Sequence, residues 1–157
     1  MSSEPGQFIL SSGTFPVGQR KDPPRILVAE DDAHLLRLIA RLLRAAGIEV
    51  ETAATPEAAL ELISALGFDL ILSDLFAPEM SGAKLVAAVR LFDPLLPIVI
   101  ISGDTECRDA ISAIGDPALY FVGKPFDNEV LLDLICELVG MERKGQIRPP
   151  APRAIGE

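Results

Sequence analysis

The amino-acid sequence predicts a doubly wound α/β fold with a five-stranded parallel sheet. Five short apolar runs, each too brief to be a helix, alternate along the chain with five segments whose apolar residues recur at helical spacing. Strands that alternate with helices indicate a parallel sheet covered by helices on both faces. The chain has 157 residues, of which 49% are hydrophobic, and this supplies one domain of ordinary size with ample material for a core.

The first half of the domain contains three predicted strands and two predicted helices. The strands are expected at 25–29, 48–53 and 68–73. The helix between the first two strands is indicated by apolar residues at helical spacing and by the glycine that follows them: Leu35, Leu38, Ile39, Leu42 and Gly47. The second helix begins at Thr55, with a hydroxyl cap, a proline at the first helical position and an acid in the first turn. Its buried face is expected to comprise Ala59, Leu62, Ile63 and Leu66.

The second half contains two predicted strands and three predicted helices. A helix is expected at 83–92, and the strand that follows at 97–101 is the most apolar of the five, which favours a central position in the sheet. A weakly indicated helix at 106–114 precedes the fifth strand at 119–122. The last helix is expected at 127–139, and its buried face should comprise Leu131, Leu134, Ile135 and Leu138.

The two ends of the chain differ in composition from its middle. Residues 1–24 are rich in serine, glycine and proline, and residues 141–157 contain several prolines and glycines. Such segments are typical of flexible extensions or linkers. The structured domain is therefore predicted to span 25–140. The composition leaves open whether this domain stands alone or is part of a longer protein.

Charge and cysteine content limit the possible functions. With 14 basic and 23 acidic residues the formal charge is −9, so direct binding to nucleic acid is not expected. No apolar run is long enough to span a membrane, and the start of the chain lacks the pattern of a signal peptide, which favours a cytoplasmic protein. Cys107 and Cys136 lack metal-binding spacing. They are interpreted as reduced thiols, with a single disulfide as the alternative.

Polar side chains follow four of the five predicted strands. In open parallel sheets the ligand site lies beyond the carboxyl ends of the strands, so these residues are the candidates for chemistry: Glu30, Asp31, Asp32, Asp74, Ser102 and Lys124. Each one also has an ordinary explanation. Asp32 can simply cap a helix, and Asp74 can be a turn residue. A functional site is favoured because all of them fall on the same edge of the sheet.

Together these groups predict a particular chemistry. Clustered carboxylates repel one another and need a cation, and hard oxygen ligands suit Mg²⁺. A carboxylate beside that metal can attack phosphorus and become an acyl phosphate. A metal ion and an ammonium group offset the charge on the transferred phosphoryl oxygens, and a hydroxyl can bind the phosphoryl group once it arrives.

The segments that carry these residues resemble the receiver domains of two-component response regulators. The resemblance covers about residues 25 to 140 and rests on four motifs in order: Ile-Leu-Val-Ala-Glu30-Asp31-Asp32, Phe-Asp-Leu-Ile-Leu-Ser-Asp74-Leu-Phe-Ala-Pro78, Ile-Val-Ile-Ile-Ser102-Gly103 and Tyr120-Phe-Val-Gly-Lys124-Pro125. It implies the flavodoxin-like, or CheY-like, fold with strand order 2-1-3-4-5.

The resemblance also implies a role for each acidic residue and for Lys124. Asp74 corresponds to the phospho-acceptor, and Lys124 to the ammonium that pairs with a phosphoryl oxygen. Asp31 and Asp74 would be direct ligands of Mg²⁺, with Glu30 acting at longer range through water. The backbone carbonyl of Phe76 would be the third protein ligand.

Three further residues correspond to positions with known roles in such domains. Ser102 matches the hydroxyl that follows the phosphoryl group on activation, and Phe121 the rotating switch aromatic, although Phe121 could instead be an ordinary core residue. Tyr120 should point to the opposite side of the strand. Pro125 is expected to follow a cis peptide bond. His34 is expected to be a surface residue and not a phospho-donor.

The resemblance predicts a signalling domain and not a conventional enzyme, since it would catalyse only its own aspartyl phosphorylation and dephosphorylation. Its partners would be a sensor histidine kinase or phosphotransfer protein, and an output domain or second copy bound through the face of the fourth helix, fifth strand and fifth helix. One alternative is a receiver fold that acts by protein contacts without phosphorylation. The other is an Asp-nucleophile phosphohydrolase, which is disfavoured because Phe76 stands where such enzymes carry a second aspartate.

Overall fold

The computed structural model describes residues 22–74 and 82–142, which form a five-stranded parallel sheet with five helices. The strands are β1 (Arg25–Ala29), β2 (Glu49–Ala53), β3 (Leu70–Ser73), β4 (Ile98–Ser102) and β5 (Leu119–Gly123). The helices are α1 (Ala33–Ala45), α2 (Pro56–Ala65), α3 (Gly82–Phe92), α4 (Thr105–Ile114) and α5 (Asn128–Val139). The strand order is β2-β1-β3-β4-β5, as predicted.

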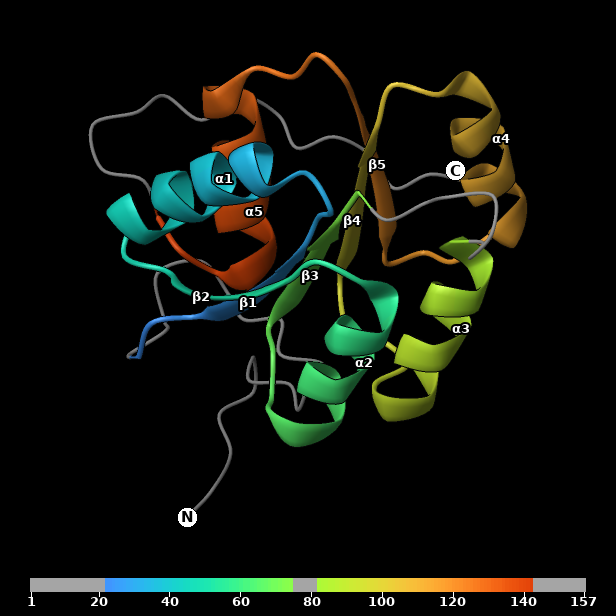
Figure 1. The fold of residues 1–157 in the computed structure, drawn as a ribbon, viewed down its shortest axis with the longest axis horizontal. Coiled ribbons are helices and arrows are strands. Elements are labelled where there is room, and N and C mark those ends of the chain that lie inside the picture. The colour runs from blue at the N-terminus through green and yellow to red at the C-terminus, as the bar shows by residue number, and fades with distance from the viewer. Residues whose placement is uncertain (1–21, 75–81, 143–157) are drawn as a thin grey trace, which may run out of the picture.

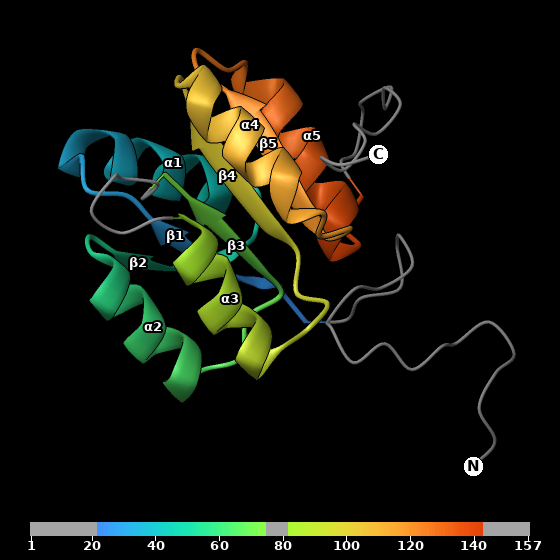
Figure 2. The same ribbon diagram turned by 90° about the vertical axis from the view of Figure 1, so that its right-hand side faces the viewer.

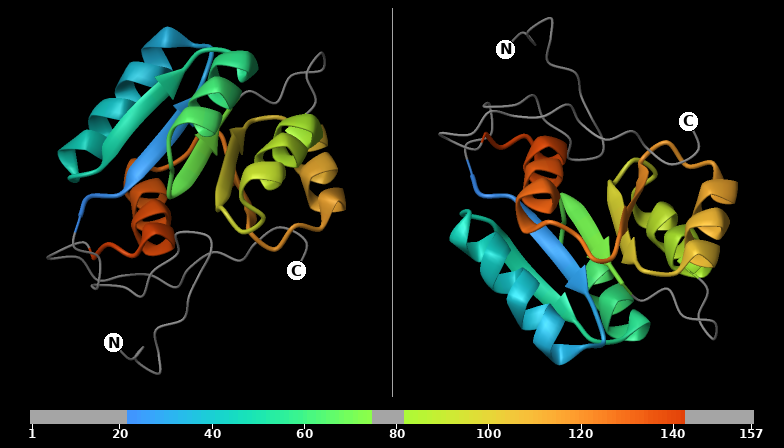
Figure 3. Two further views of the ribbon diagram at one scale, coloured as in Figure 1. Left: turned by 90° about the horizontal axis from the view of Figure 1, so that it is seen from below. Right: turned by 90° about the horizontal axis from the view of Figure 1, so that it is seen from above.

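Helices cover both faces of the sheet (Figure 1). Helices α1 and α5 pack on one face, and α2, α3 and α4 pack on the other. The turned views in Figure 2 and Figure 3 show the same two layers with the sheet between them. Each layer encloses a separate apolar core, because successive side chains of a strand point to opposite faces. The doubly wound prediction is therefore confirmed.

Helix α1 begins at an aspartate cap and buries a different stripe from the one expected. The Asp32 carboxylate accepts hydrogen bonds from the amides of His34 at 3.0 Å and Leu35 at 3.3 Å. The buried residues of the helix are Ile39, Ala40 and Leu43. Leu38, which the sequence pattern places on the apolar face, is 45% exposed. Helix α1 is therefore rotated about its own axis from the expected orientation, so that Leu38 lies at the margin of the buried face.

Helices α2 and α5 begin where the sequence places their starts. The Thr55 hydroxyl accepts a hydrogen bond from the Ala58 amide at 3.1 Å, and Asp127 accepts from the amides of the first turn of α5. Helix α5 ends at Gly140, whose φ of 80° is left-handed and suits glycine. Of the residues expected to be buried on these helices, Leu62, Leu66 and Leu138 are only partly buried.

One detail of the sheet differs from expectation. Strand β3 begins at Leu70, two residues later than predicted. The carboxylate of Asp69 accepts a hydrogen bond from the Arg25 amide at 2.9 Å, so this residue joins β1 through its side chain. The most apolar strand, β4, has an interior position in the sheet, as predicted. All five residues of β4 are buried, because it lies between β3 and β5.

Cys107 and Cys136 are buried and form no disulfide in the described part of the structure, in agreement with the interpretation as thiols. Cys107 belongs to the core under α2, α3 and α4, and Cys136 to the core under α1 and α5. The sheet therefore separates the two sulfur atoms. Among the described residues, no helix is long and apolar enough to cross a membrane. Phe76 and nearly all of the two predicted extensions lie outside the described residues.

Candidate functional site

The carboxyl ends of the five parallel strands lie together at one edge of the sheet. Strands β1 and β3 are paired so that Ala29 is opposite Ser73. Glu30 and Asp74 therefore follow the ends of two neighbouring strands. The Asp74 amide donates a hydrogen bond to the Ala29 carbonyl at 2.9 Å. The Asp74 side chain is 16% exposed, so its carboxylate lies at the bottom of the site and not out in solvent.

Lys124 contacts Asp74 directly. The Nζ atom of Lys124 donates a hydrogen bond to Oδ2 of Asp74. Strands β3 and β5 are not neighbours, so this contact passes over the end of β4. The Lys124 amide also donates to the Ser102 carbonyl at 3.0 Å, which holds the lysine against β4. The bond between Lys124 and Pro125 is cis, as predicted.

The lysine ammonium is held in its charged form by the acidic residues around it. Burial acts to lower the pKa of Lys124, but the hydrogen bond and charge of Asp74 and the charges of Glu30 and Asp32 outweigh burial. The pKa of Lys124 is therefore raised above its ordinary value. The site keeps one fixed positive charge among several carboxylates, which is the arrangement needed to bind a phosphoryl oxygen.

Glu30 is a buried acid with one unsatisfied oxygen. Its side chain is 2% exposed, and its Oε2 atom accepts a hydrogen bond from the Asp32 amide at 3.0 Å. Its Oε1 atom is buried and has no hydrogen-bond partner among the described residues. The pKa of Glu30 is raised from 4.5 to about 8, because burial and the adjacent Asp74 raise it by more than the Asp32 amide and Lys124 lower it.

We predict that Glu30→Gln stabilises the protein when no metal ion is present. Because the folded-state pKa of Glu30 is raised from 4.5 to about 8, its contribution to stability is full below pH 4.5 and is lost as the pH rises to about 8. The neutral glutamine avoids that loss. The free energy of unfolding at pH 8.5, measured by urea denaturation with a chelator, should rise by about 1–3 kcal/mol.

The matched control for this prediction is Glu51→Gln, which removes a carboxylate from an exposed position on β2. It should change the stability by less than about 0.5 kcal/mol. The gain from Glu30→Gln should also shrink between pH 8.5 and pH 6. A glutamine variant that is less stable than the parent at pH 8.5 would contradict the assignment of Glu30 as a destabilising buried charge.

The other two acids after β1 are exposed. Asp32 caps α1, which is the ordinary role considered for it, and Asp31 lies in the turn between Glu30 and Asp32. Within residues 22–74 and 82–142, no three acidic, histidine or cysteine side chains form a ready-made metal cluster. The expected third ligand, the carbonyl of Phe76, lies outside this part of the chain. His34 is exposed in the first turn of α1, as expected.

The donors that are present nevertheless fit a hard divalent cation. They are carboxylate oxygens, which Mg²⁺ prefers to nitrogen or sulfur. The buried Oε1 atom of Glu30 lacks a partner that a metal-bound water could supply. Asp31 is exposed and can therefore turn toward Asp74 without breaking a hydrogen bond described for its side chain.

Ser102 lies at the end of β4 with its hydroxyl turned toward α4. The side chain is buried, and its Oγ atom accepts a hydrogen bond from the Asp104 amide at 3.0 Å. Burial raises the pKa of the Cys107 thiol, and the nearby Ser102 side chain acts in the opposite direction. Sequence reasoning missed Cys107. Its position five residues after Ser102, in the first half of the next helix, is the only signal that could have indicated it.

Phe121 and the neighbouring Tyr120 lie on opposite faces of β5, as the alternation of a strand predicts. Phe121 packs against the core under α2, α3 and α4, and Tyr120 packs against the core under α1 and α5. Both are partly buried. Phe121 thus lies on the face that also holds Cys107, three residues before Lys124.

Comparison with known proteins adds family relationships to this geometry. The family model described as "Response regulator receiver domain" matches residues 26–136. The transcriptional regulatory protein GlrR of Escherichia coli is 31% identical over 113 residues, which are 72% of this chain and 26% of that protein. The cell cycle response regulator CtrA of Brucella ovis is 31% identical over 115 residues, covering 73% of this chain and 50% of the regulator.

A solved structure gives a similar result. The chemotaxis response regulator CheY4 of Vibrio cholerae superimposes with a TM-score of 0.65 and 31% identity, covering 74% of this chain and 98% of that protein. The curated relatives are longer: this chain spans about a quarter of GlrR and half of CtrA.

Proposed function

The chain belongs to the response regulator receiver family, and from this membership we propose that it is a phospho-accepting switch. In the proposal Asp74 receives a phosphoryl group from a sensor histidine kinase or a phosphotransfer protein. The observation that carries the proposal is the contact of Asp74 with Lys124 beside the buried Glu30. A carboxylate held next to an ammonium and a second acid has both a nucleophile and the charge to stabilise transfer.

The chemical step breaks the P–O or P–N bond that joins the phosphoryl group to its donor and forms a P–O bond to Asp74. A carboxylate oxygen of Asp74 attacks phosphorus, the bond to the donor's leaving group breaks with its electron pair, and an acyl phosphate forms. Lys124 then exchanges its hydrogen bond with Asp74 for one with a phosphoryl oxygen. In this proposal the chain acts as a signalling domain and not as a conventional enzyme.

Mg²⁺ is the proposed cofactor. Asp31 and Asp74 would bind it directly, Glu30 through a water molecule, and Phe76 through its backbone carbonyl. When bound, the ion would offset negative charge on the transferring phosphoryl oxygens. The unsatisfied Oε1 atom of Glu30 and the exposed carboxylate of Asp31 support this ligand set.

Ser102 and Phe121 are the proposed switch residues. To reach a phosphoryl group, the Ser102 hydroxyl must give up its hydrogen bond with the Asp104 amide. Asp104 is the N-cap of α4 and accepts from the Glu106 amide at 2.9 Å, so this change is passed directly to α4. Phosphorylation would then shift the population of conformations at the face of α4, β5 and α5. An output domain or a second copy of the chain would read that face.

We propose a cytoplasmic location for this reaction, where the kinase domains that phosphorylate such receivers lie. The alternative of a receiver that acts by contacts alone gives no role to the hydrogen bond between Asp74 and Lys124. The alternative of a phosphohydrolase lacks its second aspartate, since Phe76 stands at that position.

Incubation with acetyl phosphate and Mg²⁺, followed by intact-mass measurement, tests the proposal. We expect a mass gain of one phosphoryl group. Removal of Mg²⁺ with a chelator should slow the gain at least tenfold, because the carboxylates then repel the incoming phosphoryl oxygens without an offsetting cation. Addition of excess Mg²⁺ after the chelator should restore it. A chain that gains no phosphoryl group with Mg²⁺ present, while remaining folded by circular dichroism, would refute the proposal.

A further inference from the structure

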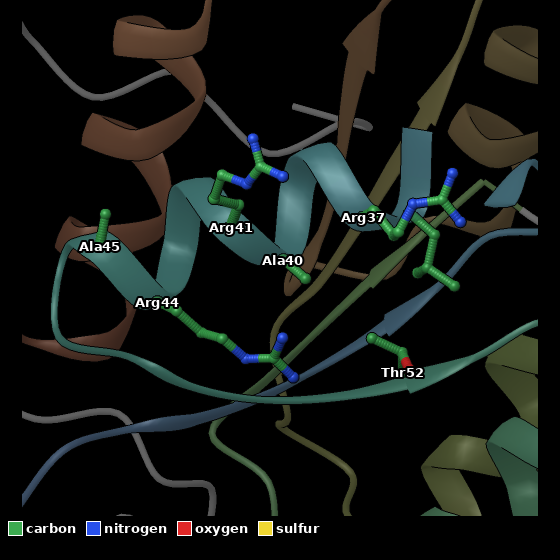
Figure 4. Close-up of a pocket in the computed structure, with 7 residues that line it drawn as sticks. Arg37, Ala40, Arg41, Arg44, Ala45 and Thr52 are labelled. Atoms are coloured by element: carbon green, nitrogen blue, oxygen red, sulfur yellow. The ribbon is translucent and has the colours of Figure 1, made fainter. Parts of the chain in front are cut away.

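A basic hollow lies between α1 and the edge strand β2, away from the Asp74 site. Its volume is about 620 Å³, and its charged lining consists of Arg37, Arg41 and Arg44 from α1, with Thr52 of β2 across from them. Figure 4 shows Arg44 extending from the helix toward β2 near Thr52, with Arg37 at the other end and Ala40 between them. The hollow therefore has Arg37 and Arg44 at its two ends with a small apolar floor between them, and Arg41 rises from the other side of the helix in this view.

The three arginines share this region because of their spacing along α1. Residues four and three positions apart on a helix lie on neighbouring turns of the same side. All three side chains are exposed, and Arg44 alone has a described hydrogen bond, from its guanidinium to the Val50 carbonyl at 3.0 Å. Among the described residues, no carboxylate forms an ion pair with Arg37 or Arg41. Two guanidinium groups are thus available to a ligand.

The acidic residues of β2 do not neutralise the hollow. Val50 packs in the core under α1, and Thr52 lies on the same side of the strand by the alternation of side chains. Glu49 and Glu51 therefore point to the opposite side, and Glu49 pairs with Arg25 at 3.5 Å. Like charges four residues apart destabilise a helix, so Arg37 and Arg41 repel each other unless an anion lies between them.

The shape and charge of the hollow select a compact anion. A guanidinium group binds phosphate oxygens through two parallel hydrogen bonds, and the volume falls in the range of small-molecule pockets. The chain as a whole carries a charge of −9, which repels a long polyanion such as a nucleic acid. A small ligand feels mainly the charges within about 8–10 Å, and the charged residues that line the hollow are the arginines.

We propose that this hollow binds a small ligand with two linked phosphate groups, one held by Arg37 and Arg41 and the other by Arg44 and Thr52. The apolar floor at Ala40 can receive an attached organic group, as in a nucleoside diphosphate. The proposal does not rest on the function proposed for Asp74, because the hollow uses none of the residues of that site.

Titration calorimetry with inorganic pyrophosphate, in the presence of a chelator so that no metal bridges the ligand to Asp74, tests the proposal. We expect measurable binding that weakens as salt is raised from 20 to about 200 mM, because the contacts are between charges. Orthophosphate should bind at least tenfold more weakly, since it can fill only one half of the site. Adenosine diphosphate should bind at least as tightly as pyrophosphate if the floor receives an organic group.

The double variant Arg37→Gln with Arg41→Gln should weaken pyrophosphate binding by on the order of a hundredfold. The variant Arg108→Gln removes one exposed arginine from α4 and should bind like the parent, as should Asp74→Asn. Replacement of Arg37 and Arg41 by lysine should weaken binding by a smaller factor. An ammonium group keeps the positive charge but cannot donate two parallel hydrogen bonds to one phosphate group. Absence of binding at low salt, or equal loss in the Arg108 variant, would overturn the proposal.

Discussion

Asp74→Asn should abolish the mass gain of one phosphoryl group after treatment with acetyl phosphate and Mg²⁺. The amide is a far poorer nucleophile than the carboxylate and cannot form an acyl phosphate. Rate losses of this kind reach several orders of magnitude, so no product is expected on the time scale on which the parent is fully modified. The shape of the residue is kept, and the amide oxygen can still accept the hydrogen bond from Lys124.

The matched control for this loss is Asp109→Asn, which makes the same chemical change at an exposed position on α4. That variant should be phosphorylated at the parental rate. Both variants should give the parental circular dichroism spectrum, because neither residue is in an apolar core. A phosphoryl group that is still gained by the Asp74→Asn variant would place the acceptor elsewhere in the chain.

Arg90→Ala should lower the free energy of unfolding by about 3 kcal/mol. This is the largest effect on stability that we expect from a single substitution outside the apolar cores. Arg90 joins α3 to the segment before β5: its Nε and Nη2 atoms donate to the two carboxylate oxygens of Asp116 at 2.6 and 3.1 Å. Its Nη1 atom donates to the Leu96 carbonyl at 2.7 Å. The two charged side chains are only 16% and 12% exposed, so the alanine variant leaves a largely buried carboxylate without its partner.

The stability that this pair contributes should depend on pH. Burial acts to raise the pKa of Asp116, but the Arg90 hydrogen bond, the Ala118 amide and the Arg90 charge outweigh it and lower the pKa from 3.8. A lowered folded-state pKa means that the contribution is full above the ordinary value and is lost as the pH falls through the folded-state value. Urea denaturation at pH 7 should therefore show a larger difference between Arg90→Ala and the parent than denaturation at pH 3.

Arg108→Ala is the control for charge, since Arg108 is exposed on α4, and it should change stability by less than about 0.5 kcal/mol. The double variant Arg90→Ala with Asp116→Ala should recover part of the loss, because no buried charge is then left without a partner. Equal unfolding free energies for Arg90→Ala and the parent at pH 7 would show that the pair contributes nothing.

The elements of the fold could be predicted because each has a local cause in the sequence. Thr55 with the proline after it fixes the start of α2, and Asp127 fixes that of α5. What periodicity could not determine is the rotation of α1. Leu35, Leu38 and Leu42 form an acceptable stripe, yet the helix packs on the sheet and beside α5 with Leu38 exposed. The choice between adjacent stripes depends on residues far away in the sequence.

The candidate site was predictable to the level of which strand end carries which group. Spacing places Asp74 and Lys124 at the same edge of the sheet, and the structure puts them in contact. The state of Glu30 could not be foreseen, because its burial and its unsatisfied oxygen depend on the packing of the strands around it. The effect of Ser102 on the pKa of Cys107 was hidden for a similar reason, since a cysteine in a helix gives no local sign of the groups that surround it.

Strand β5 limits how the sequence can change over evolutionary time. Tyr120 and Phe121 are adjacent but belong to different cores, and Lys124 lies three residues beyond Phe121. An inserted or deleted residue would exchange the two aromatic rings between the cores and move Lys124 away from Asp74, because the faces of a strand alternate with period two. The strand can accept new side chains one at a time, but its length is fixed jointly by both cores and by the lysine.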